Sequence, residues 1–479
     1  MSPRRHSHLR SRHSSLTGLF HKHPVAALWL LFMVARLPYM ILEWPGCFYP
    51  DTTESVEQFF GFAGFTTQLC TTDPSVVLTN HHPVIYTLLY GGTFALGNMC
   101  GSQAVAMFMF LLLQAALHSW VLARLLNRLR HSWHTGSLWP WWCVVIFFVL
   151  FPPFGFWSTT MLKDTFFSTC MLWLMLLLLE VVQSGGRILR KPLFVIYFVA
   201  VTLLFMLSKN QCAYIVALLM LTTVVFYRPA RWRLTLSLAV PLLLYELFLH
   251  ILLPHFNVAL SGRQELHGFM FQQTALYMKQ HPNDVRPEER KAIAAVLPID
   301  KLAKLHDPDL QDPVKFRYKV GASDTEFAAY RRVHLAMMMR HPETGLESLW
   351  LGCKDYFIPT ARFPLFYPSL SVYNPPKRGF YKLRALFQPQ PSGMQAIMTV
   401  PVVGWLFRMG LYVILSLLVC VLMLLLRRWN ALLVMLPIII SIGVLIVSPQ
   451  NGCFRYVMPI VWATPISLLL LQLPHRTHR

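Results

Sequence analysis

The stretch VAALWLLFMVARLPYMILEWPGCFYPDTTE, residues 25–54, joins a long apolar run to a loop that opens with acids. Its first part, 25–42, is long enough for a membrane-spanning helix, since such a helix needs about 20 mostly apolar residues. Asp51 and Glu54 then follow Pro50, in a chain with only 21 acids among 479 residues. This stretch therefore bears on both fold and function, because it places carboxylates at the end of a predicted membrane span.

Comparable apolar runs recur along the whole chain, which is 55% hydrophobic. The runs are continuous and do not alternate apolar with polar residues, so they predict membrane helices and not the strands of a barrel. We expect an all-α polytopic membrane protein.

The charges indicate how the spans are oriented. The chain has 42 Lys and Arg against 21 acids, a net charge of +21, and most basic residues lie in short loops between apolar runs. This is the positive-inside pattern of membrane proteins, and it does not resemble the basic face of a nucleic-acid-binding domain. We therefore expect membrane lipid as a partner and no nucleic acid.

Placing every short basic loop in the cytoplasm predicts about ten spans, with both termini cytoplasmic and the protein in the cell (plasma) membrane. The predicted spans are 25–42, 103–122, 138–153, 163–182, 193–207, 211–227, 234–253, 398–426, 431–447 and 455–473. The weaker run 83–97 cannot span in this scheme and is predicted to be a helix at the outer interface.

Four regions follow from this topology. Residues 1–24 form a basic, disordered cytoplasmic tail, and 25–253 form an N-terminal transmembrane module whose first outer loop is 43–102. Residues 254–397 form a mostly helical, soluble extracytoplasmic insertion, within which an amphipathic helix pair breaks at His341-Pro342 and a Pro- and aromatic-rich cap covers 359–383. Residues 398–479 hold the last transmembrane helices and a short cytoplasmic tail.

Ionisable residues collect in the turns that this topology places outside. They are Asp51, Glu54, His81, His82, Lys163, Asp164, Lys209 and Arg455. Each has a structural explanation: the cations can extend to lipid headgroups, His81-His82 can form a helix-entry turn, and Asp51 with Glu54 can form a capping box. Together they favour a site for a lipid phosphate, where cations hold the phosphate and a carboxylate is the general base for an acceptor hydroxyl.

We assign roles on that basis. Asp51 is the candidate general base, Glu54 supports it, and Glu57 lies on a solvated face. Asp164 orients Lys163 or contacts the sugar, and it completes the set of candidate catalytic acids. The phosphate-site candidates are His81, His82, Lys163, Lys209 and Arg455.

The order of these features resembles the GT-C glycosyltransferases, integral membrane enzymes that use polyprenyl-phosphate sugars at the outer face. The shared features are a first span from inside to outside and a first outer loop that opens with an acid and carries interfacial helices. The set PD…HHP…KD…KN…RY is similar, more specifically, to an uncharacterised family of bacterial multispan membrane proteins. The resemblance implies a GT-C-like fold and Asp51 as the catalytic residue.

It also implies a polyprenyl-phosphate sugar as donor and a cell-envelope glycan or lipid as acceptor. Several GT-C enzymes have two adjacent acids in the first loop, whereas Thr52 and Thr53 follow Asp51 here. We therefore predict no metal ligand, and a divalent metal requirement stays open. The insertion also precedes the last three spans, whereas the soluble domain of many GT-C enzymes is C-terminal.

Two other functions are open at the sequence level. A transporter or lipid flippase would place ionisable groups such as Arg36 and Glu246 along a path across the membrane. An outer-face polysaccharide polymerase or ligase would depend on arginines of the large outer loop, for which Arg263, Arg362 and Arg378 are candidates.

Overall fold

The computed structural model describes residues 22–132, 136–360, 398–447 and 450–473. Within these ranges the chain is mostly helical, and its only sheet is one parallel pair of two-residue strands, β1 (Cys47–Phe48) and β2 (Thr160–Met161). The predicted cap over 359–383 lies almost wholly outside the described residues.

In the part of the chain that the structure describes, four helices are long and apolar enough to cross a membrane. They are α2 (Pro24–Leu42), α6 (Gln103–His131), α9 (Lys163–Gln183) and the run Arg231–His255, which comprises α12 (Arg231–Leu247), the π-helix η2 (Phe248–Leu252) and α13 (Leu253–His255). A fifth candidate is the pair α7 (Trp139–Leu150) and α8 (Pro152–Ser158), which bends by 53° at Phe151. Two prolines follow the bend, and proline ends a preceding helix because it disfavours helical geometry in the residue before it. An all-α membrane protein is thus confirmed.

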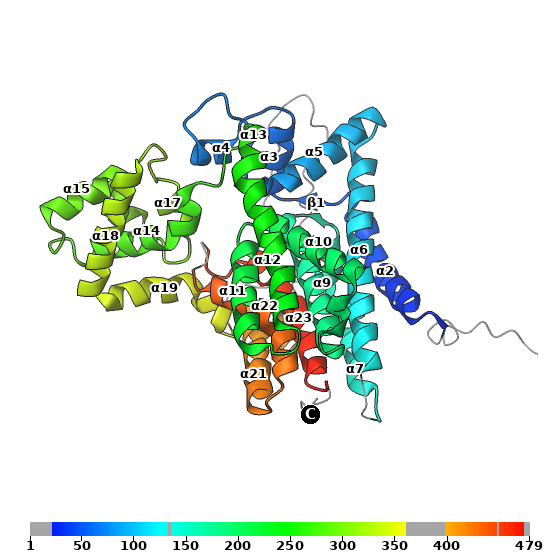
Figure 1. The fold of residues 1–479 in the computed structure, drawn as a ribbon. Helices are drawn as coiled ribbons and strands as arrows, with labels where there is room; N and C mark the ends of the chain where they lie inside the picture. The colour runs from blue at the N-terminus through cyan, green and yellow to red at the C-terminus, as the bar shows by residue number, and fades with distance from the viewer. Residues whose placement is uncertain (1–21, 133–135, 361–397, 448–449, 474–479) are drawn as a thin grey trace, which may run out of the picture.

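Shorter apolar helices complete the bundle. They are α10 (Pro192–Ser208), α11 (Cys212–Phe226), α21 (Met409–Leu425), α22 (Trp429–Leu445) and α23 (Phe454–Leu470), with the 3-10 turns η1 (Arg187–Arg190) and η3 (Val403–Phe407) beside them. Figure 1 shows the end of α23, the end of α21 and the start of α7 at one end of the bundle.

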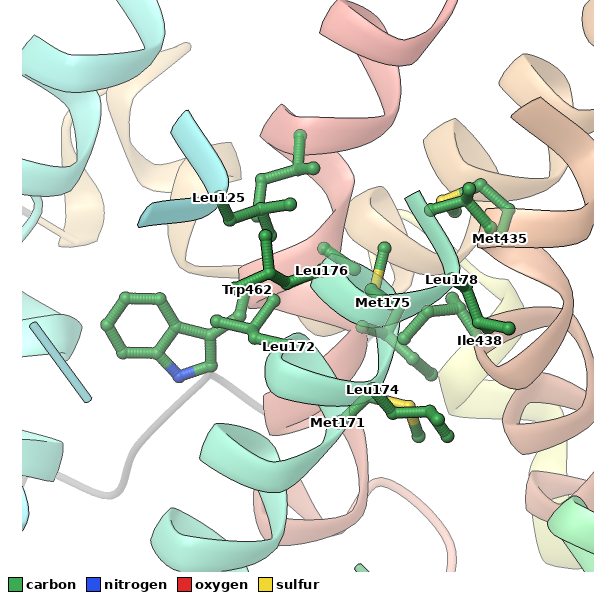
Figure 2. Packing of buried hydrophobic residues seen from close by; sticks show 14 of the residues in the cluster. Leu125, Met171, Leu172, Leu174, Met175, Leu176, Leu178, Met435, Ile438 and Trp462 are labelled. Carbon is green, nitrogen blue, oxygen red and sulfur yellow. The ribbon is translucent and has the colours of Figure 1, made fainter. Parts of the chain in front are cut away.

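Helix α9 forms the centre of the bundle, and 83% of its most apolar window is buried. It is apolar on every face, as expected of a helix surrounded by others. Figure 2 shows its residues Met171 to Leu178 packed among Leu125 of α6, Met435 and Ile438 of α22, and Trp462 of α23. Because α9 starts at Lys163, this packing fixes the position of Lys163 and Asp164.

The first loop folds at the opposite end of the bundle from the ends of α21 and α23 (Figure 1). It contains β1, α3 (Pro50–Phe59), α4 (Phe65–Cys70) and α5 (Val84–Met99), so the helix predicted over 83–97 is present. Pro50 is the first residue of α3, a position where its missing N–H costs nothing.

Two details of α3 correct the sequence analysis. The N-cap residue is Tyr49, and Asp51 lies inside the first turn, so Asp51 and Glu54 do not form the predicted capping box. Glu57 is only 6% exposed, so it does not lie on a solvated face. Helix α3 packs against α5, and six of its ten residues are buried, so little of its surface faces solvent.

The insertion forms a helical body with its own core. Its helices are α14 (Arg263–Gln280), α15 (Pro287–Val296), α16 (Ile299–Leu305), α17 (Asp312–Lys315), α18 (Asp324–Arg340) and α19 (Pro342–Phe357). The predicted helix pair with a break at His341-Pro342 is confirmed as α18 and α19. Figure 1 shows this body projecting sideways from the bundle, beside the first loop.

Candidate functional site

The strand pair holds the first loop against the start of α9. Cys47 N donates to Thr159 O over 2.9 Å, and β1 lies parallel to β2. Thr52 Oγ1 donates to Met161 O over 2.5 Å, which ties the first turn of α3 to the residues just before Lys163. These local contacts place Asp51 opposite Lys163, although 112 positions separate them in the sequence.

Asp51 is the centre of a compact ionic cluster. Its Oδ2 lies 2.9 Å from Lys163 Nζ, 2.9 Å from Arg455 Nη1 and 3.9 Å from His82 Nδ1. Glu54 Oε2 lies 3.8 Å from His82 Nε2, on the far side of the imidazole. We call Asp51, Glu54, His82, Lys163 and Arg455 the Asp51 cluster. Five of the eight predicted residues therefore meet at one place.

The protonation of His82 follows from its partner. Lys163 Nζ lies 2.6 Å from His82 Nδ1, and an ammonium group can only donate, so Nδ1 accepts and the proton lies on Nε2. Burial and the neighbouring charge of Lys163 lower the pKa of His82 well below its usual range, against the opposing effect of Asp51. His82 is therefore a neutral link between Lys163 and Glu54.

The pKa values of the two carboxyl groups of the cluster are shifted in opposite directions. Burial by itself would raise the pKa of Asp51, but Arg455, Lys163 and His82 outweigh it and hold that pKa well below its usual range. Burial raises the pKa of Glu54, and the charges of Asp51 and Glu57 add to the effect. Asp51 is thus a firmly ionised counter-ion, and Glu54 is the more basic carboxylate of the pair.

A second ion pair lies beside the cluster. Lys209 Nζ is 2.6 Å from Asp164 Oδ1, and the side chain of Asp164 is fully buried. Asp164 therefore neutralises Lys209, and the expectation that it orients Lys163 is wrong. The reason is helix geometry: Lys163 and Asp164 are consecutive in α9, and consecutive side chains point about 100° apart around a helix.

Aromatic rings link the ion pair to the cluster. Lys209 Nζ lies 4.4 Å from the ring centroid of Tyr456, and the Arg455 guanidinium carbon lies 6.0 Å from the same ring and 5.7 Å from that of Tyr49. Such distances allow cation–π attraction. Tyr456 therefore lies within cation–π range of both Lys209 and Arg455.

Hydrogen bonds from α5 and its entry turn hold the surrounding turns together. Tyr86 OH lies 3.1 Å from Lys163 O and 3.0 Å from Ser208 O, which joins the start of α9 to the end of α10. Asn210 Nδ2 donates to Asn80 O over 2.8 Å, and Asn80 Oδ1 accepts from Val84 N at the start of α5. Hydrogen bonds thus connect the start of α9, the end of α10 and the turn before α5.

The insertion reaches the site through His81. His81 Nδ1 lies 3.8 Å from Glu265 Oε1, and Glu265 also lies 3.2 Å from Lys315 Nζ. Burial lowers the pKa of His81, with Lys163 and Lys315 adding to the effect and Glu265 opposing it. His81 therefore lies between the insertion and the Asp51 cluster, because its ring centroid is also 4.7 Å from that of His82. The sequence analysis missed Glu265, because nothing local to it signals a contact 184 positions away.

Residues of the alternative functions lie elsewhere. Arg36 is buried and donates to Ala115 O and Ser119 Oγ, whereas Glu246 is exposed and pairs with His250. Arg36 and Glu246 thus have separate partners and do not form an ion pair with each other. Arg263 pairs with Asp324 within the insertion, and Arg362 and Arg378 lie outside the described residues.

The arrangement offers cations and carboxylates for distinct tasks. Lys163 and Arg455 converge on a single carboxylate oxygen, a geometry that a phosphate oxygen can also satisfy. The cluster also contains Glu54, a carboxylate that can accept a proton, and the neutral His82 beside it. Such a set can bind an anionic group and take a proton from a hydroxyl.

Comparison with known proteins identifies a family and no named relative. No curated protein and no solved structure matches the chain. A family of unknown function, DUF6020, matches residues 66–479, a range that includes His82, Lys163, Lys209 and Arg455 and begins after Asp51. Because this match spans most of the sequence, the chain belongs to the DUF6020 family.

Proposed function

We propose that this protein is a GT-C-like membrane glycosyltransferase that moves a sugar from a polyprenyl-phosphate carrier to an extracytoplasmic glycan or lipid acceptor. The observation that carries the proposal is the placement of Asp51 Oδ2 at 2.9 Å from both Lys163 Nζ and Arg455 Nη1. A first-loop carboxylate and two convergent cations are the groups that transfer from a lipid phosphate requires.

The reaction uses these groups in a defined order. The donor phosphate binds Lys163 and Arg455 and takes over hydrogen bonds that Asp51 otherwise accepts. The acceptor hydroxyl oxygen then bonds to the anomeric carbon of the sugar, and its proton passes to Asp51. The bond from that carbon to the phosphate oxygen breaks, and its electron pair stays on the phosphate, where the two cations stabilise it. Attack opposite the leaving phosphate inverts the anomeric carbon.

Removal of its counter-cations makes Asp51 a better base. Its pKa is low because Arg455, Lys163 and His82 together outweigh the effect of burial. A phosphate that draws the two cations away leaves burial as the main influence, and burial raises the pKa of a carboxyl group. Glu54, whose pKa burial already raises, supports Asp51 through His82.

The proposal includes the ten-span topology. The four long helices, the bent pair α7–α8 taken as one span and the five shorter apolar helices would together cross the membrane ten times, with both termini in the cytoplasm. The Asp51 cluster then faces the outer side, where polyprenyl-linked sugars are used. The 17-residue α10, α21, α22 and α23 approach the minimum length for a span.

The experiment is transfer from labelled polyprenyl-phosphate hexoses and pentoses by the purified, reconstituted protein. Asp51→Asn should lower the transfer rate by about 10²- to 10⁴-fold, the usual contribution of a general base. Asp73→Asn is the matched control, because Asp73 is an exposed acid of the same loop whose Oδ1 accepts hydrogen bonds from Ser75 N and Ser75 Oγ. Arg455→Gln should weaken donor binding.

Three outcomes would contradict the proposal. Full transfer by Asp51→Asn at normal expression would remove Asp51 from the chemistry. Loss of activity in Arg263→Ala with Asp51→Asn unaffected would favour a polysaccharide polymerase or ligase. Movement of the lipid carrier across the bilayer without sugar transfer would favour a flippase.

A further inference from the structure

Two helix ends of the insertion meet at a pair of histidines. Helix α14 ends at Gln280 and α18 ends at Arg340, and in each case the next two residues are His-Pro. The rings of His281 and His341 stack with their centroids 3.8 Å apart and their planes 15° apart. Two His-Pro dipeptides, each at the end of a different helix, are therefore neighbours in the structure.

The surroundings of this pair favour a cation. The last turn of a helix carries partial negative charge on its free carbonyl groups, and two such ends converge here. Three acids and one arginine, namely Asp284, Glu289, Glu343 and Arg340, lie around the rings. Arg340 pairs with Asp284 and Glu289, which leaves the charge of Glu343 beside the histidines.

Three donor atoms converge in this environment. One atom each from His281, His341 and Glu343 can be chosen so that all lie within 4.8 Å of one another. Glu343 Oε1 is 2.8 Å from His341 Nδ1, and His281 Nε2 is 3.0 Å from Thr344 Oγ1. The side chain of Glu343 is 66% exposed and that of His341 is 29% exposed, so an ion can enter from solvent.

We propose that His281, His341 and Glu343 bind a divalent transition-metal ion, with zinc as the best match. Two imidazoles and a carboxylate form a donor set that zinc accepts, with water as a fourth ligand. The ion joins the end of α14 to the start of α19. It is a structural site, and the proposal is independent of the sugar-transfer proposal.

An ion at this position would fix how the insertion is held relative to the rest of the molecule. The other end of α14 carries Glu265, which contacts His81 beside the Asp51 cluster. The other end of α19 is held to the bundle, where Tyr356 OH donates to Gln450 O over 2.6 Å and accepts from Cys453 N over 3.0 Å. A metal that fixes α14 to α19 therefore fixes the insertion over the candidate site.

A rival arrangement uses the same residues without metal. His341 Nε2 lies 3.6 Å from Asp284 Oδ2, so His341 has a carboxylate near each ring nitrogen. Direct contacts of His341 with Asp284 and Glu343 would explain that geometry. The two arrangements differ in metal content.

The test uses the full chain, purified in detergent, stripped with a chelator, incubated with zinc chloride and desalted. Mass spectrometry of the metal should give one zinc per chain, and zinc should raise the melting temperature. His281→Ala and His341→Ala should each weaken zinc binding by at least about 10-fold. Glu343→Gln, an exposed change that preserves the fold, should weaken it too.

His267→Ala is the matched control, because His267 lies on α14 near Arg263 O and outside the cluster. It should retain one zinc per chain. The proposal is overturned if the wild-type chain holds no zinc, or if His341→Ala and Glu343→Gln hold as much as His267→Ala. Absence of zinc from the wild-type chain would leave the metal-free contacts of His341 with Asp284 and Glu343 as the explanation of this geometry.

Discussion

Asp51 has two roles that a single fixed arrangement cannot serve. It is a counter-ion to Lys163 and Arg455, and it is the proposed base. A carboxylate with a low pKa is a poor base, so both roles are served only if a ligand exchanges places with Asp51 on the cations. At the residue scale, the site therefore depends on competition between a carboxylate and a phosphate for the same donors.

Replacement of Asp51 by Asn should lower stability at neutral pH by about 1–3 kcal/mol, because it leaves Lys163 and Arg455 close together without their shared anion. The folded-state pKa of Asp51 lies below its ordinary value, so its contribution is full above about pH 4–5 and declines as pH falls. Melting temperatures of wild type and Asp51→Asn from pH 3 to about 7 measure this. A difference that grows toward acid pH would contradict the assignment.

Tyr86 and Tyr90 offer a matched pair for the hydrogen bonds beneath the cluster. Both are buried in α5, and Tyr86 OH bonds Lys163 O and Ser208 O, whereas Tyr90 OH has no hydrogen-bond partner among the described residues. Tyr86→Phe should cost about 1–2 kcal/mol, and Tyr90→Phe should be neutral or stabilising. Thermal unfolding of both variants in one detergent checks this, and equal losses would disprove it.

At the scale of elements, the position of Asp51 depends on how α3 packs. Helix α3 is short and cannot be stable alone, since isolated helices under about 12–15 residues are marginal in water. Contacts with α5 and the bond from Thr52 to β2 supply its stability. The close approach of α3 to α5 occurs at Gly91, where a Cβ would lie 2.2 Å from Phe59 Cβ.

Adjacent glycines of α5 test this packing. Gly91→Ala should separate α3 from α5, lower stability by about 1–3 kcal/mol and reduce sugar transfer, because overpacking forces the backbone to shift. Gly92→Ala should be neutral or stabilising by up to about 1 kcal/mol, since nothing lies within 4 Å of its Cβ and alanine favours helix. Thermal unfolding and transfer rates measure both. Similar behaviour of the two variants would exclude the packing argument.

At the scale of the molecule, polar chemistry and basic loops lie at opposite ends of the bundle. Figure 1 places α3, α4 and α5 at one end and the ends of α21 and α23 at the other. Arg427 and Arg428 directly follow α21 in the sequence. In the proposed ten-span topology the positive-inside rule places this second end in the cytoplasm, and the candidate site would then face outward.

Cysteine labelling of intact cells tests this orientation. In a chain whose exposed Cys100 and Cys143 are replaced by serine, Thr72→Cys in the first loop should react with a membrane-impermeant maleimide. Arg187→Cys, in an exposed basic loop, should react only after the cells are made permeable. Labelling of Arg187→Cys alone in intact cells would reverse the orientation and rule out an outward-facing site.

The helices and the members of the site were predictable from the sequence, whereas the pairing of charged side chains within the site was not. Apolar runs predicted helices α2, α6 and α9, and the break at His341-Pro342 predicted α18 and α19, because these signals are local. The sequence also selected the members of the Asp51 cluster, since charges at a membrane boundary are rare. It assigned Asp164 to Lys163 wrongly, because chain neighbours on a helix do not face each other.

The sequence by itself therefore determined that this is a helical membrane protein and which polar residues are unusual in it. Hydrophobic length and loop charge are properties of short segments, and they do not depend on tertiary contacts. The tertiary structure decided which cation neutralises which acid, that Glu57 is buried, and that Glu265 and the two His-Pro turns have partners. Those pairings join residues tens to hundreds of positions apart, and only the packing around α9 and α3 brings them together.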